Sequence, residues 1–195
     1  MTGSILLGIF IIILVLAAVL VVRTCSRQPT PAMTASVELD KGPRAREYGE
    51  QLSKMIQKET VSSRFDSDKT KYYEFHKILE ELFPLVHKTC EKHVFNGNLL
   101  FKWSGKGKAE PILLMSHQDV VEANGSWEHE PFGGYIDGEG KLWGRGTVDT
   151  KGSLYCIFRS VEELISEGVQ PEGDVYIASS CTEEFSGEGA ALSVE

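Results

Sequence analysis

The sequence predicts an α/β fold in which one transmembrane helix precedes a mixed, largely parallel sheet with flanking helices. An uninterrupted run of apolar residues and glycine, residues 5–22, opens the chain. Short apolar runs and amphipathic segments then alternate, which is the pattern of α/β domains. Polar residues directly follow two of the apolar runs, as is typical of the ligand-binding edge of such a sheet.

The N-terminal run is long enough to cross a bilayer as a helix. No Lys or Arg precedes it, and Arg23 and Arg27 occupy the place where a cleavage motif would be expected, so a retained anchor is favoured over a signal peptide. We therefore expect residues 1–27 to form a single-pass membrane anchor with its flank, and residues 28–43 to form a polar linker. The basic residues after the run favour a cytoplasmic soluble part, although the side of the membrane stays open.

The composition of the chain restricts the class of function. The formal net charge is −8 and no basic cluster is present, so we expect no nucleic-acid partner. None of the four cysteines lies in a C-x-x-C pair, which argues against a zinc finger or a thioredoxin-like motif. The polar groups near the predicted strand ends are therefore the better candidates for function.

Residues 44–195 carry the periodic patterns of a folded domain. Apolar residues at helical spacing predict helices at Arg44–Glu59, Thr70–Val86 and Lys151–Gly168. Shorter apolar runs predict strands at Pro111–Met115, Lys141–Trp143 and Asp174–Ser180, and a hairpin at Lys92–Trp103 that turns at residues 96–98. Pro84 is expected to end or kink the second helix. The continuous apolar run Pro111–Met115 is expected to be buried on both faces.

Five acidic or imidazole side chains stand where these elements meet. His117 and Asp119 follow one predicted strand, and Glu183 and Glu184 follow another. Asp149 lies in a glycine-rich turn just before the third predicted helix. Because ligands bind at the carboxyl ends of the strands in open α/β sheets, we expect these three segments to converge at one edge.

These residue types suit a hydrolytic metal centre. Zinc takes imidazole and carboxylate ligands, and one aspartate can bridge two ions. Asp119 could orient His117 through the second ring nitrogen, while one of the adjacent glutamates binds metal and the other acts as a general base. Taken singly, His117 could be structural, the glutamates could be solvated, and Asp149 could cap the following helix. The combination favours the metal centre.

A serine hydrolase is the rival chemistry. Ser116 adjoins His117 and Asp119, but a catalytic triad works by convergence in space and needs an exposed nucleophile. The chain contains no G-x-S-x-G elbow, and the sequence around Ser186 lacks the first glycine of that motif. The metal centre is therefore the preferred interpretation.

Three ordered motifs resemble those of the co-catalytic zinc metallopeptidases that include carboxypeptidase S, the aminoacylases and the bacterial glutamate carboxypeptidases. The motifs are Ser116–Val121, then Trp127–Gly134 with Gly144–Gly152, then Thr182–Glu184 with Gly187. The segment Glu59–Ser62 also resembles the end of the family's opening helix. Carboxypeptidase S is the branch that the chain resembles most.

The resemblance implies two zinc ions, with other divalent ions possible, and a role for each residue. His117 would bind one zinc ion, and Asp119 would orient that imidazole. Asp149 would bridge the two ions, and Glu184 would bind the other one. Glu183 would be the general base for the attacking water. The implied reaction is hydrolysis of an amide or peptide bond next to a free carboxylate, in a dipeptide, an N-acyl amino acid or a C-terminal residue.

The chain departs from the family pattern in three respects. Glu122 stands where many relatives have proline and Thr182 where many have aspartate, and neither position is a ligand. The family also supplies a further acidic ligand, a distant histidine and a smaller domain that binds substrate and often dimerises, all downstream of the glutamate pair. We therefore expect residues 44–195 to be the N-terminal part of the catalytic domain, inactive alone. The alternative is a catalytically incomplete membrane-tethered fragment or a non-enzymatic homologue.

Overall fold

The computed structural model describes residues 2–26 and 42–192. The chain separates into an N-terminal unit and a second, larger unit. Helix α1 (Thr2–Cys25) is the element of the first unit, and its segment Gly3–Cys25 is long and apolar enough to cross a membrane. A signal sequence near an N-terminus meets the same criteria, so α1 is a candidate span. Most of the linker expected at residues 28–43 lies outside the described residues.

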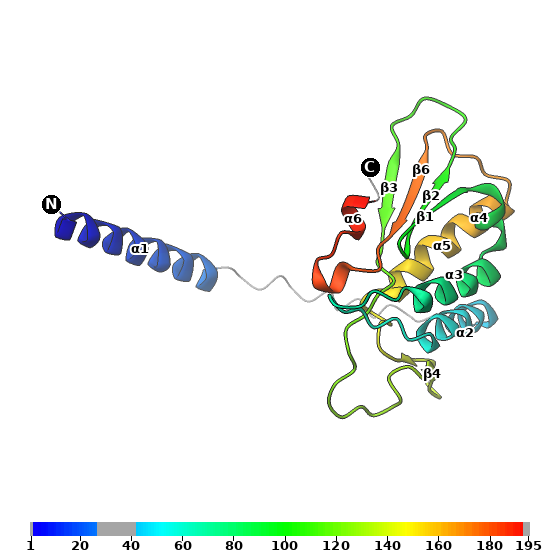
Figure 1. Cartoon of the computed structure of the whole chain (residues 1–195), viewed down its shortest axis with the longest axis horizontal. Coiled ribbons are helices and arrows are strands. Elements are labelled where there is room, and N and C mark those ends of the chain that lie inside the picture. The colour runs from blue at the N-terminus through cyan, green and yellow to red at the C-terminus, as the bar shows by residue number, and fades with distance from the viewer. Residues whose placement is uncertain (1, 27–41, 193–195) are drawn as a thin grey trace. The chain divides into compact units, whose positions relative to one another are not determined.

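The second unit contains the remaining helices and strands (Figure 1). Its helices are α2 (Pro43–Gln57), α3 (Thr70–Leu82), α4 (Pro84–Thr89), α5 (Lys151–Ser166), the 3₁₀ turn η1 (Glu183–Phe185) and α6 (Gly189–Leu192). Its strands are β1 (Glu91–Phe95), β2 (Asn98–Trp103), β3 (Ile112–Met115), β4 (Tyr135–Ile136), β5 (Leu142–Trp143) and β6 (Val175–Ser179). Each element expected within this unit is present with small shifts at its ends, except one helix that is divided in two.

One predicted helix is in fact two. The expected helix over Thr70–Val86 ends at Leu82, and α4 begins at Pro84. Proline has no backbone N–H to donate to the preceding turn, and it disfavours helical geometry in the residue before it. Phe83 accordingly leaves the helical region, with φ −132° and ψ 60°. Proline is well suited to the first position of a helix, so the chain resumes as α4 in a new direction.

The main sheet is mixed, with the strand order β1-β2-β6-β3. The strands β1 and β2, and likewise β2 and β6, pair antiparallel, whereas β3 and β6 pair parallel. The expectation of a largely parallel sheet is therefore wrong for the described residues. The reason is the tight turn at Asn96 and Gly97, whose φ angles of 47° and 87° suit a two-residue hairpin that returns the chain antiparallel. Strands β4 and β5 form a separate two-stranded sheet.

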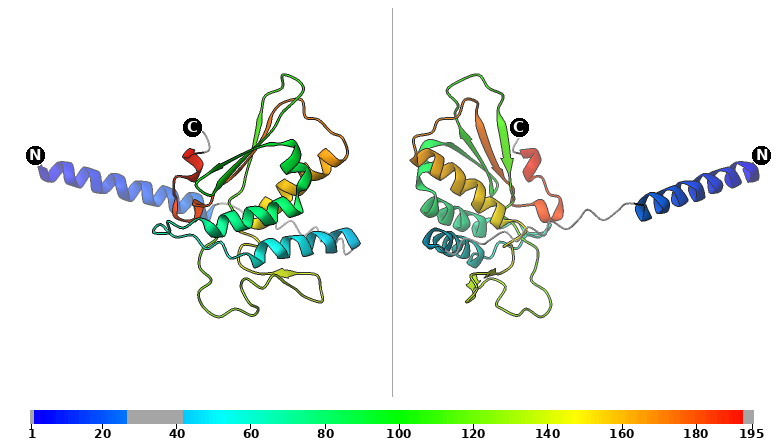
Figure 2. Two further views of the ribbon diagram at one scale, coloured as in Figure 1. Left: turned by 45° about the vertical axis from the view of Figure 1, so that its right-hand side comes forward. Right: turned by 180° about the vertical axis from the view of Figure 1, so that it is seen from behind.

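The hydrophobic core lies between one face of this sheet and the layer of helices α2–α5 (Figures 1 and 2). Alternate residues of a strand point to the same face, and the register places Phe101 opposite Ile177 and Trp103 opposite Val175. The helices contribute buried side chains to the same cluster, including Met55, Phe75, Leu79, Val86, Leu154 and Phe158. The amphipathic pattern of α5 thus fixes its position under the strands that carry the candidate site.

Strand β3 is more exposed than its sequence predicted. Ile112, Leu113 and Met115 are each more than half exposed, which contradicts the expected burial on both faces. An apolar run indicates only that a strand can be buried, and β3 occupies an edge of the sheet, where β6 is its partner.

Candidate metal centre

The candidate site lies where the parallel strands β3 and β6 end. Backbone pairing continues beyond both strands, because Ser116 donates to the carbonyl of Ala178 at 3.2 Å and Gln118 donates to that of Ser180 at 2.8 Å. The segment that follows β3 and carries His117 therefore lies beside the segment that follows β6 and leads to Glu183 and Glu184. This is the edge at which open α/β sheets bind ligands.

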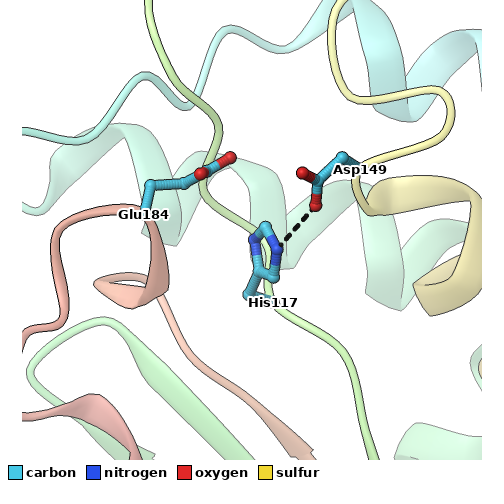
Figure 3. A group of neighbouring side chains, drawn as sticks. All are labelled: His117, Asp149 and Glu184. Atoms are coloured by element: carbon cyan, nitrogen blue, oxygen red, sulfur yellow. Dashed lines mark hydrogen bonds and ion pairs between the residues drawn. The ribbon is translucent and has the colours of Figure 1, made fainter. Parts of the chain in front are cut away.

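The imidazole of His117 is fixed at both ring nitrogens. Its Nδ1 lies 2.9 Å from the backbone carbonyl oxygen of Asp119, and its Nε2 lies 3.0 Å from Oδ1 of Asp149 (Figure 3). A carbonyl can only accept, so Nδ1 carries the proton of that bond. Nε2 is therefore the nitrogen directed at the carboxylates and available to a metal ion.

Asp149 comes from the turn before α5 and does not cap that helix. The N-cap residue of α5 is Thr150, and no side chain makes a cap hydrogen bond there. The carboxylate of Asp149 is instead 73% exposed and faces His117. Lys151 links the turn before α5 to the end of α2, because its buried Nζ donates to the carbonyls of Met55 at 3.1 Å and Lys58 at 2.6 Å. Burial lowers the pKa of Lys151 to about 7.

The two adjacent glutamates lie on the 3₁₀ turn η1 and differ in exposure. Glu184 is partly buried, and burial, followed by the negative charge of Asp149, raises the pKa of its carboxyl group. Glu183 is 58% exposed, with Oε2 at 3.6 Å from Nε2 of His117. Both carboxylates thus lie near His117, Glu184 in a partly buried position and Glu183 in a more exposed one.

Asp119 is completely buried behind these residues. Its carboxylate lies 3.4 Å from Nδ1 of His117 and accepts the backbone N–H groups of Glu183 at 3.3 Å and Glu184 at 3.1 Å. It also accepts the hydroxyl of Ser62 at 2.7 Å. Burial acts to raise the pKa of Asp119, but the hydrogen bonds from His117 and Ser62 outweigh it and hold the pKa below its usual value.

The structure thus brings together all five residues singled out from the sequence. Ligand atoms of His117, Asp149 and Glu184 all lie within 4.8 Å of one another. Burial acts to lower the pKa of His117, yet the hydrogen bonds to Asp119 raise it to about 9. The carboxylates of Asp149 and Glu183 both lie near Nε2 of His117, and a divalent cation at this point would offset their mutual repulsion. One imidazole and two carboxylates are ligands that fit Zn²⁺ and similar divalent ions.

An open cleft of about 440 Å³ adjoins the cluster and is lined by His117, Asp149 and Glu183 together with the hydroxyl-bearing residues Ser116, Ser153 and Ser180. Ser116 donates its hydroxyl to the carbonyl of Thr150 at 3.0 Å, and no hydrogen bond joins it to His117 among the described residues. A serine nucleophile activated by this histidine therefore has no support in the geometry.

The two departures from the family pattern lie outside the cluster of ligand atoms. Thr182 is buried, and its Oγ1 accepts the N–H of Gly189 at 2.9 Å. Glu122 is exposed, and its carbonyl accepts from Arg145 at 3.3 Å. Two residues that matter to the site were not assigned a role from the sequence. Ser62 was recognised only as part of a helix-end motif, and Lys151 only as the start of a helix.

Comparison with known proteins agrees with the family that the motifs resemble. The model of peptidase family M20/M25/M40 matches residues 113–195. The chain is 33% identical over 192 residues to "Probable carboxypeptidase S-like 2" of Dictyostelium discoideum, a match that covers 93% of this chain and 37% of that protein. It is 36% identical over 146 residues to the N-fatty-acyl-amino acid synthase/hydrolase PM20D1.1 of Danio rerio, covering 71% of this chain and 28% of that protein.

Solved structures of low sequence identity share the fold. The crystal structure of human carnosine dipeptidase 1 matches with a TM-score of 0.63 at 15% identity, covering 77% of this chain and 35% of that one. The mixed sheet and its helical layer are therefore an arrangement known from solved structures. The chain spans only 28–37% of the length of the relatives to which it is compared.

Proposed function

Over residues 113–195 this chain belongs to peptidase family M20/M25/M40, and from that premise we propose that the complete protein is a zinc-dependent hydrolase. Its substrate would be an amide or peptide bond next to a free carboxylate, in a small peptide or an N-acyl amino acid. The observation that carries the proposal is the convergence of His117, Asp149 and Glu184 within 4.8 Å. The names of the relatives, a carboxypeptidase S-like protein and a hydrolase of N-fatty-acyl amino acids, agree with this substrate class.

His117 and Glu184 would each hold one zinc ion, and Asp149 would bridge the two. Other divalent ions could take the place of zinc, because imidazole and carboxylate ligands bind several of them. When bound, the ions would supply an activated water molecule and polarise the carbonyl of the substrate. Asp119 would keep the imidazole of His117 in the orientation that directs Nε2 into the site.

Glu183 would act as the general base. Its carboxylate lies beside the proposed ligands, with Oε2 at 3.6 Å from Nε2 of His117, and more than half of its side chain is exposed to the cleft. Such a carboxylate can take a proton from the attacking water and deliver it to the leaving amine. The reaction needs no covalent intermediate with the protein.

The proposal is tested with the complete protein and a panel of dipeptides, C-terminally blocked and unblocked peptides, and N-acyl amino acids. We expect activity that needs the free carboxylate, is abolished by a chelator and is restored by Zn²⁺. Asp149→Asn should abolish activity, whereas the control Glu188→Gln, which removes an exposed carboxylate outside the cluster, should retain it. Activity that survives metal removal and is lost to a serine reagent would contradict the proposal.

The apolar helix α1 and the share of the relatives' length that the chain covers support further proposals. Residues 1–27 would tether the protein to a membrane, and residues 44–195 would be the N-terminal part of the catalytic domain. The three proposed ligands cannot give each of two ions the three protein ligands usual in catalytic zinc sites, so the isolated chain would be inactive. The family resemblance also implies a homodimer of the complete protein.

A further inference from the structure

The buried carboxylate of Asp119 gathers four donors from three separate segments. Its Oδ1 faces Nδ1 of His117 at 3.4 Å and the N–H of Glu183 at 3.3 Å. Its Oδ2 faces the hydroxyl of Ser62 at 2.7 Å and the N–H of Glu184 at 3.1 Å. The contact with Ser62 is the shortest of the four, and it is the one that comes from outside the segments that carry the proposed ligands and base.

The backbone around Ser62 is fixed against the segment that carries Asp119. Val120 donates to the carbonyl of Thr60 at 3.1 Å, and Ser62 donates to the carbonyl of Val120 at 3.0 Å. The hydroxyl of Thr60 adds a hydrogen bond to the carbonyl of Gln118 at 2.7 Å. These bonds make residues 60–62 a short parallel partner of the chain beyond β3, so the hydroxyl of Ser62 is held in place.

Loss of this hydroxyl would leave Oδ2 of Asp119 with one donor in a fully buried position. A buried acceptor that loses one of its partners is less well satisfied, so the carboxylate would turn or move toward its remaining donors. Those donors are His117 and the backbone of the glutamate turn. A movement of Asp119 would therefore displace the proposed ligands on both sides of the site.

We infer that Ser62 is a positioning residue of the metal centre, which acts through Asp119 to hold His117 and Glu184 at the distances that binding requires. The inference rests on the proposed function, since it assumes that these residues bind a metal ion. Groups behind the ligands of a metal typically change its affinity by about 10- to 100-fold, which sets the scale of the effect.

The test measures Zn²⁺ affinity of the complete protein by competition with a chromophoric chelator, and the visible absorption of the Co²⁺-loaded protein. We expect Ser62→Ala to weaken zinc binding about tenfold and to shift the Co²⁺ spectrum. The variants Ser62→Thr and Ser62→Val form a matched pair, because their side chains have nearly the same shape and only threonine keeps the hydroxyl. Ser62→Thr should therefore bind zinc about as tightly as the wild type, and Ser62→Val should bind it as weakly as Ser62→Ala. Ser63→Ala, at the exposed neighbouring position, is the control and should leave both readouts unchanged.

The outcomes separate the inference from the proposed function. If the wild-type protein binds no zinc at this site, the proposed function is wrong and the role of Ser62 falls with it. If the wild type binds zinc and Ser62→Ala binds equally well with the same Co²⁺ spectrum, the role of Ser62 alone is refuted. If the circular dichroism of Ser62→Ala shows a loss of fold, the Thr and Val pair decides, and equal affinities would overturn the inference.

Discussion

The carboxylate of Asp119 accepts the backbone N–H of Glu184 at 3.1 Å, although 65 positions separate the two residues in the chain. Asp119 was expected only to orient His117. It also holds the turn η1 on which both glutamates lie, because it accepts the N–H of Glu183 as well. One buried carboxylate thus links the ends of β3 and β6 and holds the segments that carry the proposed ligands.

Glu183→Gln should separate catalysis from metal binding. If Glu183 is the general base, its amide replacement should lower kcat by about 100- to 10,000-fold, the usual contribution of a positioned proton-transfer group. The bound metal, measured by elemental analysis of the purified protein, should stay at the wild-type level. Loss of metal in parallel with activity would show that Glu183 is a ligand and not the base.

Gly152→Ala should disturb the turn that carries Asp149. A Cβ atom on Gly152 would collide with the backbone carbonyl oxygen of Thr147, which cannot swing aside as a side chain can. We expect a loss of about 1–3 kcal/mol in the free energy of unfolding, typical of overpacking, together with weaker zinc binding. The control is Gly138→Ala, which has open space around the added atom. Equal denaturant midpoints for the two variants would rule out this account of the turn.

The buried pair of His76 and Gln118 should make the domain sensitive to acid. Gln118 donates its amide hydrogens to the carbonyls of Gly97 at 2.9 Å and Ser179 at 3.1 Å, so its oxygen is left to accept from Nε2 of His76 at 2.9 Å. Burial lowers the pKa of His76 to about 4, against an ordinary value of 6.5 in the unfolded chain. The folded state therefore binds this proton less readily than the unfolded state does.

The sign of the pH effect follows from that difference. The contribution of His76 to stability is fully present above pH 6.5 and is lost as the pH falls toward 4. At about 1.4 kcal/mol for each pH unit, the loss is about 3 kcal/mol. In His76→Gln a neutral amide can keep the hydrogen bond. The difference between the free energies of unfolding at pH 7 and at pH 4, measured in urea, should therefore be smaller in this variant than in the wild type by about 3 kcal/mol. The control His93→Gln, at a half-exposed position, should keep the wild-type dependence, and an unchanged dependence in His76→Gln would refute the prediction.

The N-terminal helix should decide localisation without affecting the fold of the second unit. Deletion of residues 1–41 should move the protein from the membrane fraction to the soluble fraction and leave the thermal midpoint unchanged. Mass spectrometry of the mature protein should find α1 (Thr2–Cys25) still attached. A mature N-terminus beyond Cys25 would identify the segment as a cleaved signal sequence and would exclude the anchor.

The general plan of the site could be predicted because it depends on a rule about strand ends. His117 follows β3 and Glu184 follows β6, and parallel neighbouring strands place their carboxyl ends together. The exposure of β3 could not be predicted, since an apolar composition does not reveal whether a strand is central or at an edge. Pro84 signalled an interruption, but the sequence did not decide between a kink and a second helix.

The supporting contacts could not be predicted because they join segments that are distant in sequence. The hydroxyl of Ser62 and the carboxylate of Asp119 lie 57 positions apart, and serine has many commonplace surface roles. Lys151 was even less predictable, since lysines are rarely buried and its partners are backbone carbonyls at the end of α2. Such contacts depend on the packing of whole elements, which local pattern does not specify.

The most direct test of the metal centre is anomalous X-ray diffraction from zinc-soaked crystals of the complete protein, measured on both sides of the zinc absorption edge. We expect two anomalous peaks, one at about 2.0–2.2 Å from Nε2 of His117 and the other at that distance from a carboxylate oxygen of Glu184, each also within reach of Asp149. No peak beside these residues in saturating zinc, or peaks bound by other residues, would contradict the account.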